Sequence, residues 1–299
     1  MKNAYLKALR APFLAGSVIP VIIGTALAFR ESEFVFSYLI VTLVGVAGLH
    51  LGANLINDYY DAGGSDPFNF RVTPFSGGSR VIQNKELTRD TVRTMALFFF
   101  AIGVVSGLWF VFNGRPLVLL IGMMGLVAGW AYSAPPLQLM SKGWGEILIF
   151  FAFGPLVTLG TFYVMSGFLD GTGFLLGIPQ GFFITGVIWI NQFPDYEADQ
   201  KAGKNNLVVR LTPEISRYFY CAIMLMAYAS VLIMVFSKGL SPLTLISVLS
   251  FPLAFKAMRI LWRQYLSVDG IIPAQALTIQ ALIAHGLLLS LAIWLGRFF

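Results

Sequence analysis

Three of the chain's 14 acidic residues lie within nine positions, in the segment NLINDYYDAGGSD at residues 54–66. Asp58 and Asp61 are three residues apart, and Asn54 precedes Asp58 by four. Residues three and four apart share one face of a helix. The spacing therefore predicts that Asn54, Asp58 and Asp61 form one polar stripe, with Asp66 just beyond its end.

A second acidic segment, NQFPDYEADQKAGK at residues 191–204, follows another long apolar run. It repeats the Asn-x3-Asp spacing with Asn191 and Asp195, and Asp199 follows four residues later. On a helix these three side chains form a second stripe. Pro194 falls inside that stripe and predicts a kink or a helix end. One stripe alone also fits a solvated cap at the end of a span, but two stripes with the same spacing indicate a shared function.

Carboxylates one helical turn apart repel each other, and near lipid their charge is costly. A divalent cation removes that repulsion, and Mg²⁺ prefers oxygen ligands, including those of bound phosphates. Two facing stripes therefore predict a site in which Mg²⁺ ions hold a diphosphate. The candidate metal ligands are Asp58, Asp61, Asp66, Asp195 and Asp199.

Basic residues near the two segments are candidates for contact with the diphosphate oxygens. Arg80 ends the glycine-rich segment GGSR, whose backbone N–H groups also suit an anion, and Lys142 lies in MSKGWG. Lys201 and Lys204 stand at the end of the second segment. Because basic residues are frequent in membrane-flanking loops, each of them fits a role in topology equally well.

The elements that carry these residues are predicted to be membrane helices. The chain is 57% hydrophobic and 11% charged, whereas a soluble domain has about 25% charged residues. Apolar runs of about 18 residues or more predict transmembrane helices. We expect an all-α, polytopic membrane protein with a single domain over residues 1–299. Nine apolar runs occur, at about 12–29, 35–55, 95–112, 117–133, 146–166, 174–192, 218–237, 242–258 and 274–296.

The distribution of basic residues predicts the orientation. With the N-terminus inside and the sides alternating, 16 of the 20 Lys and Arg residues fall on the inside. Cytoplasmic loops carry such an excess. We therefore expect an integral protein of the cell's inner (plasma) membrane, in contact with lipid, with the N-terminus and both acidic segments on the cytoplasmic side. The same bias explains the net charge of +6, and no nucleic-acid partner is expected.

The chain resembles the UbiA superfamily of intramembrane prenyltransferases in the order of its spans and in its inside loops. The segments that carry the resemblance are NDYYDAGGSD at 57–66, GGSRVIQ at 77–83, YSAPPL at 132–137, GWGE at 143–146 and NQFPDYEADQKAGKNNLVVRL at 191–211. The resemblance implies nine helices around a central cavity and a polyprenyl diphosphate bound through Mg²⁺. It also implies metal-binding and catalytic roles in this cavity for Asp58, Asp61, Asp195 and Asp199, with Asn54 and Asn191 beside the diphosphate.

The loop NFRVTPFSGGSR, residues 69–80, lacks the Arg-Thr-x2-Arg-Pro element of the family's 4-hydroxybenzoate and haem O branches. This difference favours the branch that prenylates 1,4-dihydroxy-2-naphthoate on the pathway to menaquinone. The resemblance then implies that the allylic C1–O bond breaks, the acceptor ring attacks C1, and the ring carboxylate leaves as carbon dioxide. Tyr132 is a candidate substrate contact through its aromatic face. Acceptors of the 4-hydroxybenzoate or homogentisate type stay open, and no general base is assigned.

An ion-coupled transporter and a CDP-alcohol phosphotransferase are the competing interpretations. Transporters place functional acids near the bilayer midplane, whereas these acids lie at the inside ends of spans. The phosphotransferase motif keeps its acids close together in sequence, whereas Asp66 and Asp195 are 129 residues apart. The two histidines, His50 and His285, lie within spans and fit packing or a helix–helix hydrogen bond better than catalysis.

Overall fold

The structure is a computed structural model that describes residues 2–32, 34–238 and 240–296. This described part contains helices and the segments that join them, and no β-strand, so the all-α prediction is confirmed. The α-helices are α1 (Lys2–Leu9), α2 (Ala15–Glu31), α3 (Phe36–Asp61), α4 (Arg89–Phe112), α5 (Val118–Ser133), α6 (Gly145–Phe151), α7 (Val157–Ser166), α8 (Gly171–Lys201), α9 (Leu207–Lys238), α10 (Phe251–Gln264) and α11 (Val268–Leu295). The shorter helical turns are η1 (Ala11–Leu14), η2 (Asp66–Phe68), η3 (Leu139–Ser141), η4 (Ala152–Leu156) and η5 (Pro242–Ser250).

The number of membrane crossings agrees with the sequence. Across the described residues, eight helical segments are long and apolar enough to span a membrane, and α5 is a ninth, shorter apolar helix of 16 residues. Three crossings combine several elements: α1, η1 and α2 in the first, α6, η4 and α7 in the fifth, and η5 and α10 in the eighth. A proline lies near each junction, at Pro12, Pro155 and Pro252. Because proline lacks the N–H that a regular helix needs, it favours a change of helix type there.

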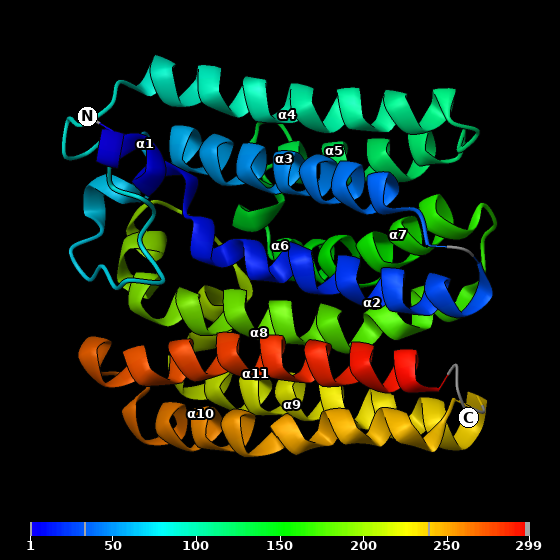
Figure 1. The fold of residues 1–299 in the computed structure, drawn as a ribbon. Helices are drawn as coiled ribbons and strands as arrows, with labels where there is room; N and C mark the ends of the chain where they lie inside the picture. Colours follow the sequence, from blue (N-terminus) through cyan, green and yellow to red (C-terminus); the bar gives the residue numbers. More distant parts are fainter. Residues whose placement is uncertain (1, 33, 239, 297–299) are drawn as a thin grey trace.

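The helices lie roughly parallel to one another, and α8 runs near the middle of the molecule (Figure 1). On one side α3 packs along α4 and also contacts α5. On the other side α8 packs along α9, and α10 along α11. Helix α2 joins the two sides because it contacts α7, α11 and α8 as well as α3.

Two hydrophobic clusters correspond to the two sides. The larger contains buried side chains from α2, α7, α8, α9, α10 and α11, such as Phe162, Phe183 and Tyr220. The smaller lies under α1, α3 and α4 and includes Leu55 and Phe100. A space between two separately packed sides is a suitable place for a ligand cavity.

Glycine allows a backbone-to-backbone contact between η4 and α8. A Cβ on Gly154 would lie 2.4 Å from the backbone nitrogen of Gly181, and one on Gly177 would lie 2.6 Å from the carbonyl oxygen of Gly154. The π-helical turn η4 therefore rests directly on the backbone of α8. Small residues at such crossings are typical of membrane helix packing.

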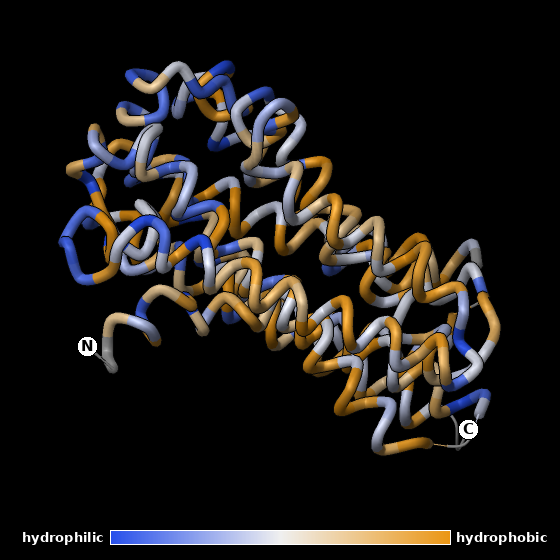
Figure 2. Tube along the Cα trace, turned by 90° about the horizontal axis from the view of Figure 1, so that it is seen from above, coloured by the Kyte–Doolittle hydropathy of each residue, from blue (hydrophilic) through white to orange (hydrophobic). Residues whose placement is uncertain are grey.

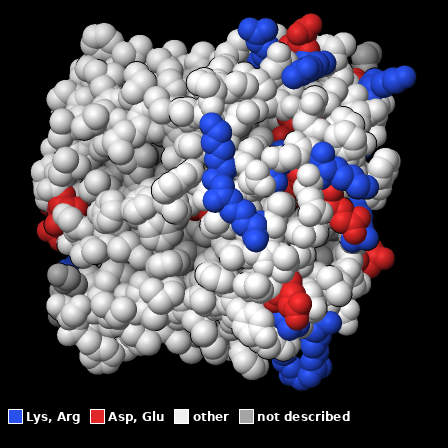
Figure 3. All heavy atoms as spheres, turned by 180° about the vertical axis from the view of Figure 1, so that it is seen from behind, with Lys and Arg blue, Asp and Glu red and all other residues white. Residues whose placement is uncertain are grey.

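The surface is apolar along the helices and charged at one end. Large apolar side chains such as Phe112, Phe236 and Leu249 are strongly exposed, as expected for a surface that faces lipid tails. Hydrophilic segments gather toward one end of the bundle (Figure 2). On the face that Figure 3 shows, most charged side chains lie at that same end. These features identify an integral membrane protein.

Candidate active site

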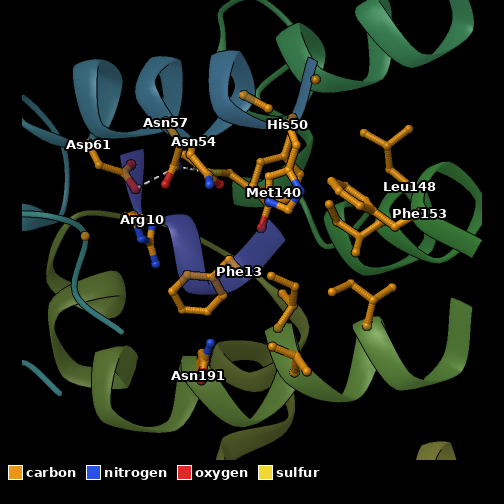
Figure 4. Close-up of a pocket in the computed structure, with 18 of the residues that line it drawn as sticks. Arg10, Phe13, His50, Asn54, Asn57, Asp61, Met140, Leu148, Phe153 and Asn191 are labelled. Atoms are coloured by element: carbon orange, nitrogen blue, oxygen red, sulfur yellow. Dashed lines mark hydrogen bonds between the residues drawn. The ribbon is translucent and has the colours of Figure 1, made fainter. Parts of the chain in front are cut away.

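The two acidic segments face each other across one cavity. Helix α3 brings the first segment and α8 the second, and a cavity of about 230 Å³ lies between them (Figure 4). Six of the predicted residues line its polar end or its adjoining wall: Asn54, Asp61, Asp66, Asn191, Asp195 and Asp199. The fold thus brings together side chains of the two segments, which are more than 120 positions apart in the sequence.

Helix α8 continues through Pro194 to Lys201. Of the two outcomes predicted at Pro194, a kink or a helix end, the helix end does not occur, and the kink stays a prediction. Because α8 is unbroken there, Asn191, Asp195 and Asp199 lie on successive turns of one helix.

The GGSR segment folds back onto the carboxylates. Gly77 and Gly78 have φ angles of 82° and 73°, which favour glycine. This turn lets the N–H of Gly77 donate to Asp195 over 3.2 Å and the N–H of Ser79 donate to both oxygens of Asp58 over 3.3 Å. The backbone N–H groups expected to bind an anion thus bind one carboxylate from each stripe.

Asp58 and Asp195 have further partners from outside their own helices. The Nδ2 of Asn69 donates to Asp195 over 2.7 Å. The guanidinium of Arg10 lies 4.0 Å from Asp58. Asp58 is 3% exposed and lies behind the cavity wall instead of lining it.

Lys204 is the cation that joins the two stripes. Its Nζ lies 2.9 Å from Asp61 and 3.5 Å from Asp199. Burial alone would lower the pKa of Lys204, but the two carboxylates outweigh it and raise that pKa. The side chain therefore stays an ammonium at any working pH. Asn57 also donates to Asp61 over 3.0 Å, and Asn206 to Asp199 over 2.8 Å.

Asp66 is buried beside two other carboxylates of the site. Burial, together with the nearby Asp61 and Asp58 carboxylates, raises the pKa of Asp66 to about 7. Its Oδ2 accepts a hydrogen bond of 2.7 Å from Gln83. An added cation would relieve this repulsion.

These residues fit a divalent metal that prefers oxygen ligands. Carboxylate and side-chain carbonyl oxygens are the ligands that Mg²⁺ takes in proteins. The Nδ2 of Asn54 has no hydrogen-bond partner among the described residues, and as an N–H donor it suits an oxygen of a bound anion and not the metal. A Cβ on Gly78 would lie 3.2 Å from Asp58 and 3.4 Å from Asp66, so glycine leaves space beside both carboxylates. Within the described part, no three acidic, His or Cys side chains already form a metal-sized cluster.

The predicted phosphate-binding residues are placed differently from one another. Arg80 donates to the backbone oxygen of Asp66 over 2.7 Å and so supports the loop. Lys142 is exposed and donates to the carbonyl of Pro136 over 2.8 Å, and Lys201 is exposed at the end of α8. These three do not line the cavity, whereas Tyr132 does.

Arg10 lines the cavity, although its place in the sequence predicts only a basic residue that flanks a membrane helix. It lies over the ring of Phe13, 4.8 Å from its centroid. Its φ angle of 50° turns the chain between α1 and η1 and directs the side chain inward (Figure 4). The signal available was an arginine directly before an apolar run that contains a proline, which also describes many ordinary flanking residues.

Beyond the acids the cavity wall is mostly apolar, with Leu49, Phe153 and Ile184 among its residues. A site with carboxylates at one end and an apolar wall beyond them suits an amphiphile that has an anionic head and a hydrocarbon tail.

Known proteins with the same features were found by comparison. The model of the UbiA prenyltransferase family matches residues 17–271. The 1,4-dihydroxy-2-naphthoate octaprenyltransferase of Mycobacterium tuberculosis is 29% identical over 245 residues, which cover 82% of this chain and 81% of that protein.

Two solved structures share the fold. A UbiA homolog from Aeropyrum pernix K1, in an apo structure, has a TM-score of 0.69 at 17% identity, covering 91% of this chain and 95% of that one. A UbiA homolog from Archaeoglobus fulgidus bound to DMAPP and Mg²⁺ has a TM-score of 0.61 at 21% identity, covering 96% and 99%.

Proposed function

The chain belongs to the UbiA prenyltransferase family and is a membrane prenyltransferase, and on that premise we propose that it transfers a polyprenyl group from polyprenyl diphosphate to 1,4-dihydroxy-2-naphthoate. The observation that carries this proposal is the pair of acidic stripes on α3 and α8, which meet at the polar end of an otherwise apolar cavity. The diphosphate occupies the polar end, and the hydrocarbon chain lies along the apolar wall.

Mg²⁺ is the proposed cofactor. Asp61, Asp66, Asp195 and Asp199 would hold it, with Asp58 behind them and with Asn54 and Asn191 as neutral neighbours. When bound, the metal neutralises the diphosphate and stabilises the charge on the leaving oxygen. The Archaeoglobus fulgidus relative bound to DMAPP and Mg²⁺ supports this assignment.

The chain's own residues position the substrates and keep water away. Arg10 and Lys204 are the cations at the cavity, so they are placed to contact the diphosphate. The allylic C1–O bond breaks with its electron pair on the diphosphate, and the electron-rich acceptor ring forms a bond to C1. The ring then loses its carboxylate as carbon dioxide, and the electron pair of the broken C–C bond returns to the ring, so that no proton is released overall. Apolar walls protect the electron-poor C1 from hydrolysis.

The choice of acceptor rests on two observations. The Mycobacterium tuberculosis relative is named for 1,4-dihydroxy-2-naphthoate, and the loop at residues 69–80 lacks the element that marks the 4-hydroxybenzoate branch. Acceptors of the 4-hydroxybenzoate or homogentisate type are the alternatives. They keep the same chemistry at C1 and change only the ring that attacks it.

A product assay tests the proposal. The protein in membranes or detergent receives a polyprenyl diphosphate, Mg²⁺ and, in parallel, 1,4-dihydroxy-2-naphthoate, 4-hydroxybenzoate or homogentisate. We expect mass spectrometry to find a decarboxylated prenyl-naphthoquinol that disappears when a chelator removes the metal. Product from another acceptor alone would move the reaction to a different pathway. Undiminished product with the chelator would contradict the role of the metal.

A further inference from the structure

His50 lies on the cavity wall, on the same face of α3 as the first acidic stripe. It precedes Asn54 by one turn and Asp58 by two. At 1.5 Å per residue it lies about 12 Å farther along the helix axis than Asp58. Its surroundings are aromatic: the ring packs edge-on against Phe153 with 4.9 Å between centroids, and Phe13 lines the same cavity (Figure 4).

A hydrogen bond to α2 fixes the orientation of this ring. The Oγ of Ser17 lies 2.5 Å from Nδ1 of His50. Ser17 is 1% exposed, and no other described group accepts from its hydroxyl. Because an unpaired buried donor is costly, the hydroxyl proton goes to Nδ1. The ring proton then resides on Nε2.

The Nε2–H group of His50 is free to act on a ligand. Across the described residues, nothing accepts a hydrogen bond from it, and its side chain lines the cavity. The second histidine differs in this respect. His285 bonds Gln180 over 3.1 Å through its own Nδ1, but it is fully buried in the larger hydrophobic cluster and does not line the cavity.

We propose that His50, held by Ser17, binds the aromatic acceptor by donating a hydrogen bond from its Nε2–H group to a hydroxyl oxygen of a hydroxylated naphthalene. This inference rests on the proposed function, because it assigns the acceptor to the wall beyond the diphosphate. The carboxylates occupy the polar end, so the acceptor ring must lie farther along the cavity. There an oxygenated arene needs a hydrogen-bond donor within an aromatic wall, and His50 supplies one.

Binding of three probes tests the contact without any turnover. The probes are 2-naphthoate, 1-hydroxy-2-naphthoate and 4-hydroxy-2-naphthoate, titrated calorimetrically into the full chain in detergent. We expect one hydroxyl group to tighten binding to the wild-type protein by about 3- to 10-fold, the range of a single hydrogen bond. In His50→Leu that preference should disappear while affinity for 2-naphthoate stays unchanged.

Two further variants and a control keep the test decisive. His50→Gln retains an N–H donor and should keep part of the preference, and Ser17→Ala should weaken it by releasing the ring. His285→Leu removes the other buried histidine and should leave the preference intact. In steady-state assays, His50→Leu should raise KM for the acceptor and not KM for the polyprenyl diphosphate.

Some outcomes would overturn the role of His50. These are an unchanged preference in His50→Leu, equal weakening of all three probes, or no preference in the wild-type protein. Any of them found alongside normal prenyl-naphthoquinol formation rejects the inference and leaves the proposed function standing. Absence of that product in the separate assay rejects the proposed function itself.

Discussion

Asp58 and Asp195 occupy matching places in the two acidic stripes. Each follows an Asn by four positions, and each accepts a backbone N–H from the loop at residues 77–79. Sequence spacing predicts that these two acids belong to one site. It could not predict their partners, because Asn69 and Gly77 lie 126 and 118 positions from Asp195 and only the folded loop brings them together.

Removing the charge of either residue should stop the reaction. We expect Asp58→Asn and Asp195→Asn each to lower prenyl transfer by about 100-fold or more, the effect of losing one charge-stabilising group. The amide keeps the size of the side chain, so the protein should stay folded. Product formation at saturating Mg²⁺ and thermal unfolding in detergent measure the two effects.

Asp90→Asn is the matched control, because Asp90 is exposed in the first turn of α4. It should retain normal activity. Near-normal turnover of either site variant in Mg²⁺ would rule out the two-stripe site.

Lys204 should contribute most to the stability of the folded protein when no metal is bound. It pairs with Asp61 and Asp199, and its side chain is only 13% exposed. Breaking a buried ion pair by removing one partner costs about 3–5 kcal/mol. Lys204→Met should therefore unfold at a lower temperature in chelator, and added Mg²⁺ should raise its unfolding temperature more than that of the wild-type protein.

Lys201→Met removes an exposed lysine three positions away and should change neither quantity. If Mg²⁺ raises the unfolding temperature of Lys204→Met and of the wild-type protein equally, then Lys204 does not substitute for the positive charge of a bound metal.

At the scale of the helices, the sequence predicts crossings well and their ends poorly. The sixth apolar run covers residues 174–192, but α8 extends from Gly171 to Lys201. The apolar run ends where polar side chains begin, whereas the backbone continues to form helical hydrogen bonds. Asp195 and Asp199 lie in that extension, whereas Asn191 is still within the apolar run. Hydropathy therefore leaves out the part of α8 that carries both carboxylates of the second stripe.

The crossing of η4 and α8 brings two backbones into direct contact and should tolerate no added atoms. A Cβ at Gly177 would meet the backbone of Gly154 and Pro155 at 2.6 Å. We expect Gly177→Ala to destabilise the protein by about 1–3 kcal/mol, the usual cost of overpacking. Thermal unfolding in detergent, together with the yield of folded protein, measures this change.

Gly107→Ala on α4 is the comparison, because no described atom lies within 4 Å of a Cβ added there. Alanine favours a helix by about 1 kcal/mol over glycine, so this variant should be as stable as the wild-type protein or more so. Equal behaviour of the two variants would mean that the η4–α8 contact contributes nothing to stability.

For the whole molecule, composition alone indicates a membrane bundle, because so few charged residues cannot cover a soluble surface. The cavity is harder to predict. Which faces of α3 and α8 meet depends on packing between the two hydrophobic clusters, and Leu49 or Ile184 on the cavity wall looks in sequence like any lipid-facing residue.

The orientation in the membrane is the remaining prediction for the whole molecule. The charge bias predicts that the N-terminus and the acidic loops lie on the cytoplasmic side. The chain has one cysteine, Cys221, so Cys221→Ala provides a background for single-cysteine variants. Asn84→Cys lies in the loop after α3, and Leu169→Cys lies between α7 and α8 at the opposite end; both positions are exposed.

In intact cells, a membrane-impermeant maleimide should label Leu169→Cys and spare Asn84→Cys, and after the membrane is opened it should label both. The Cys221→Ala background without an added cysteine controls for nonspecific labelling. Protection of Leu169→Cys together with labelling of Asn84→Cys would show that the protein has the opposite orientation. The acidic cavity would then open on the side away from the cytoplasm.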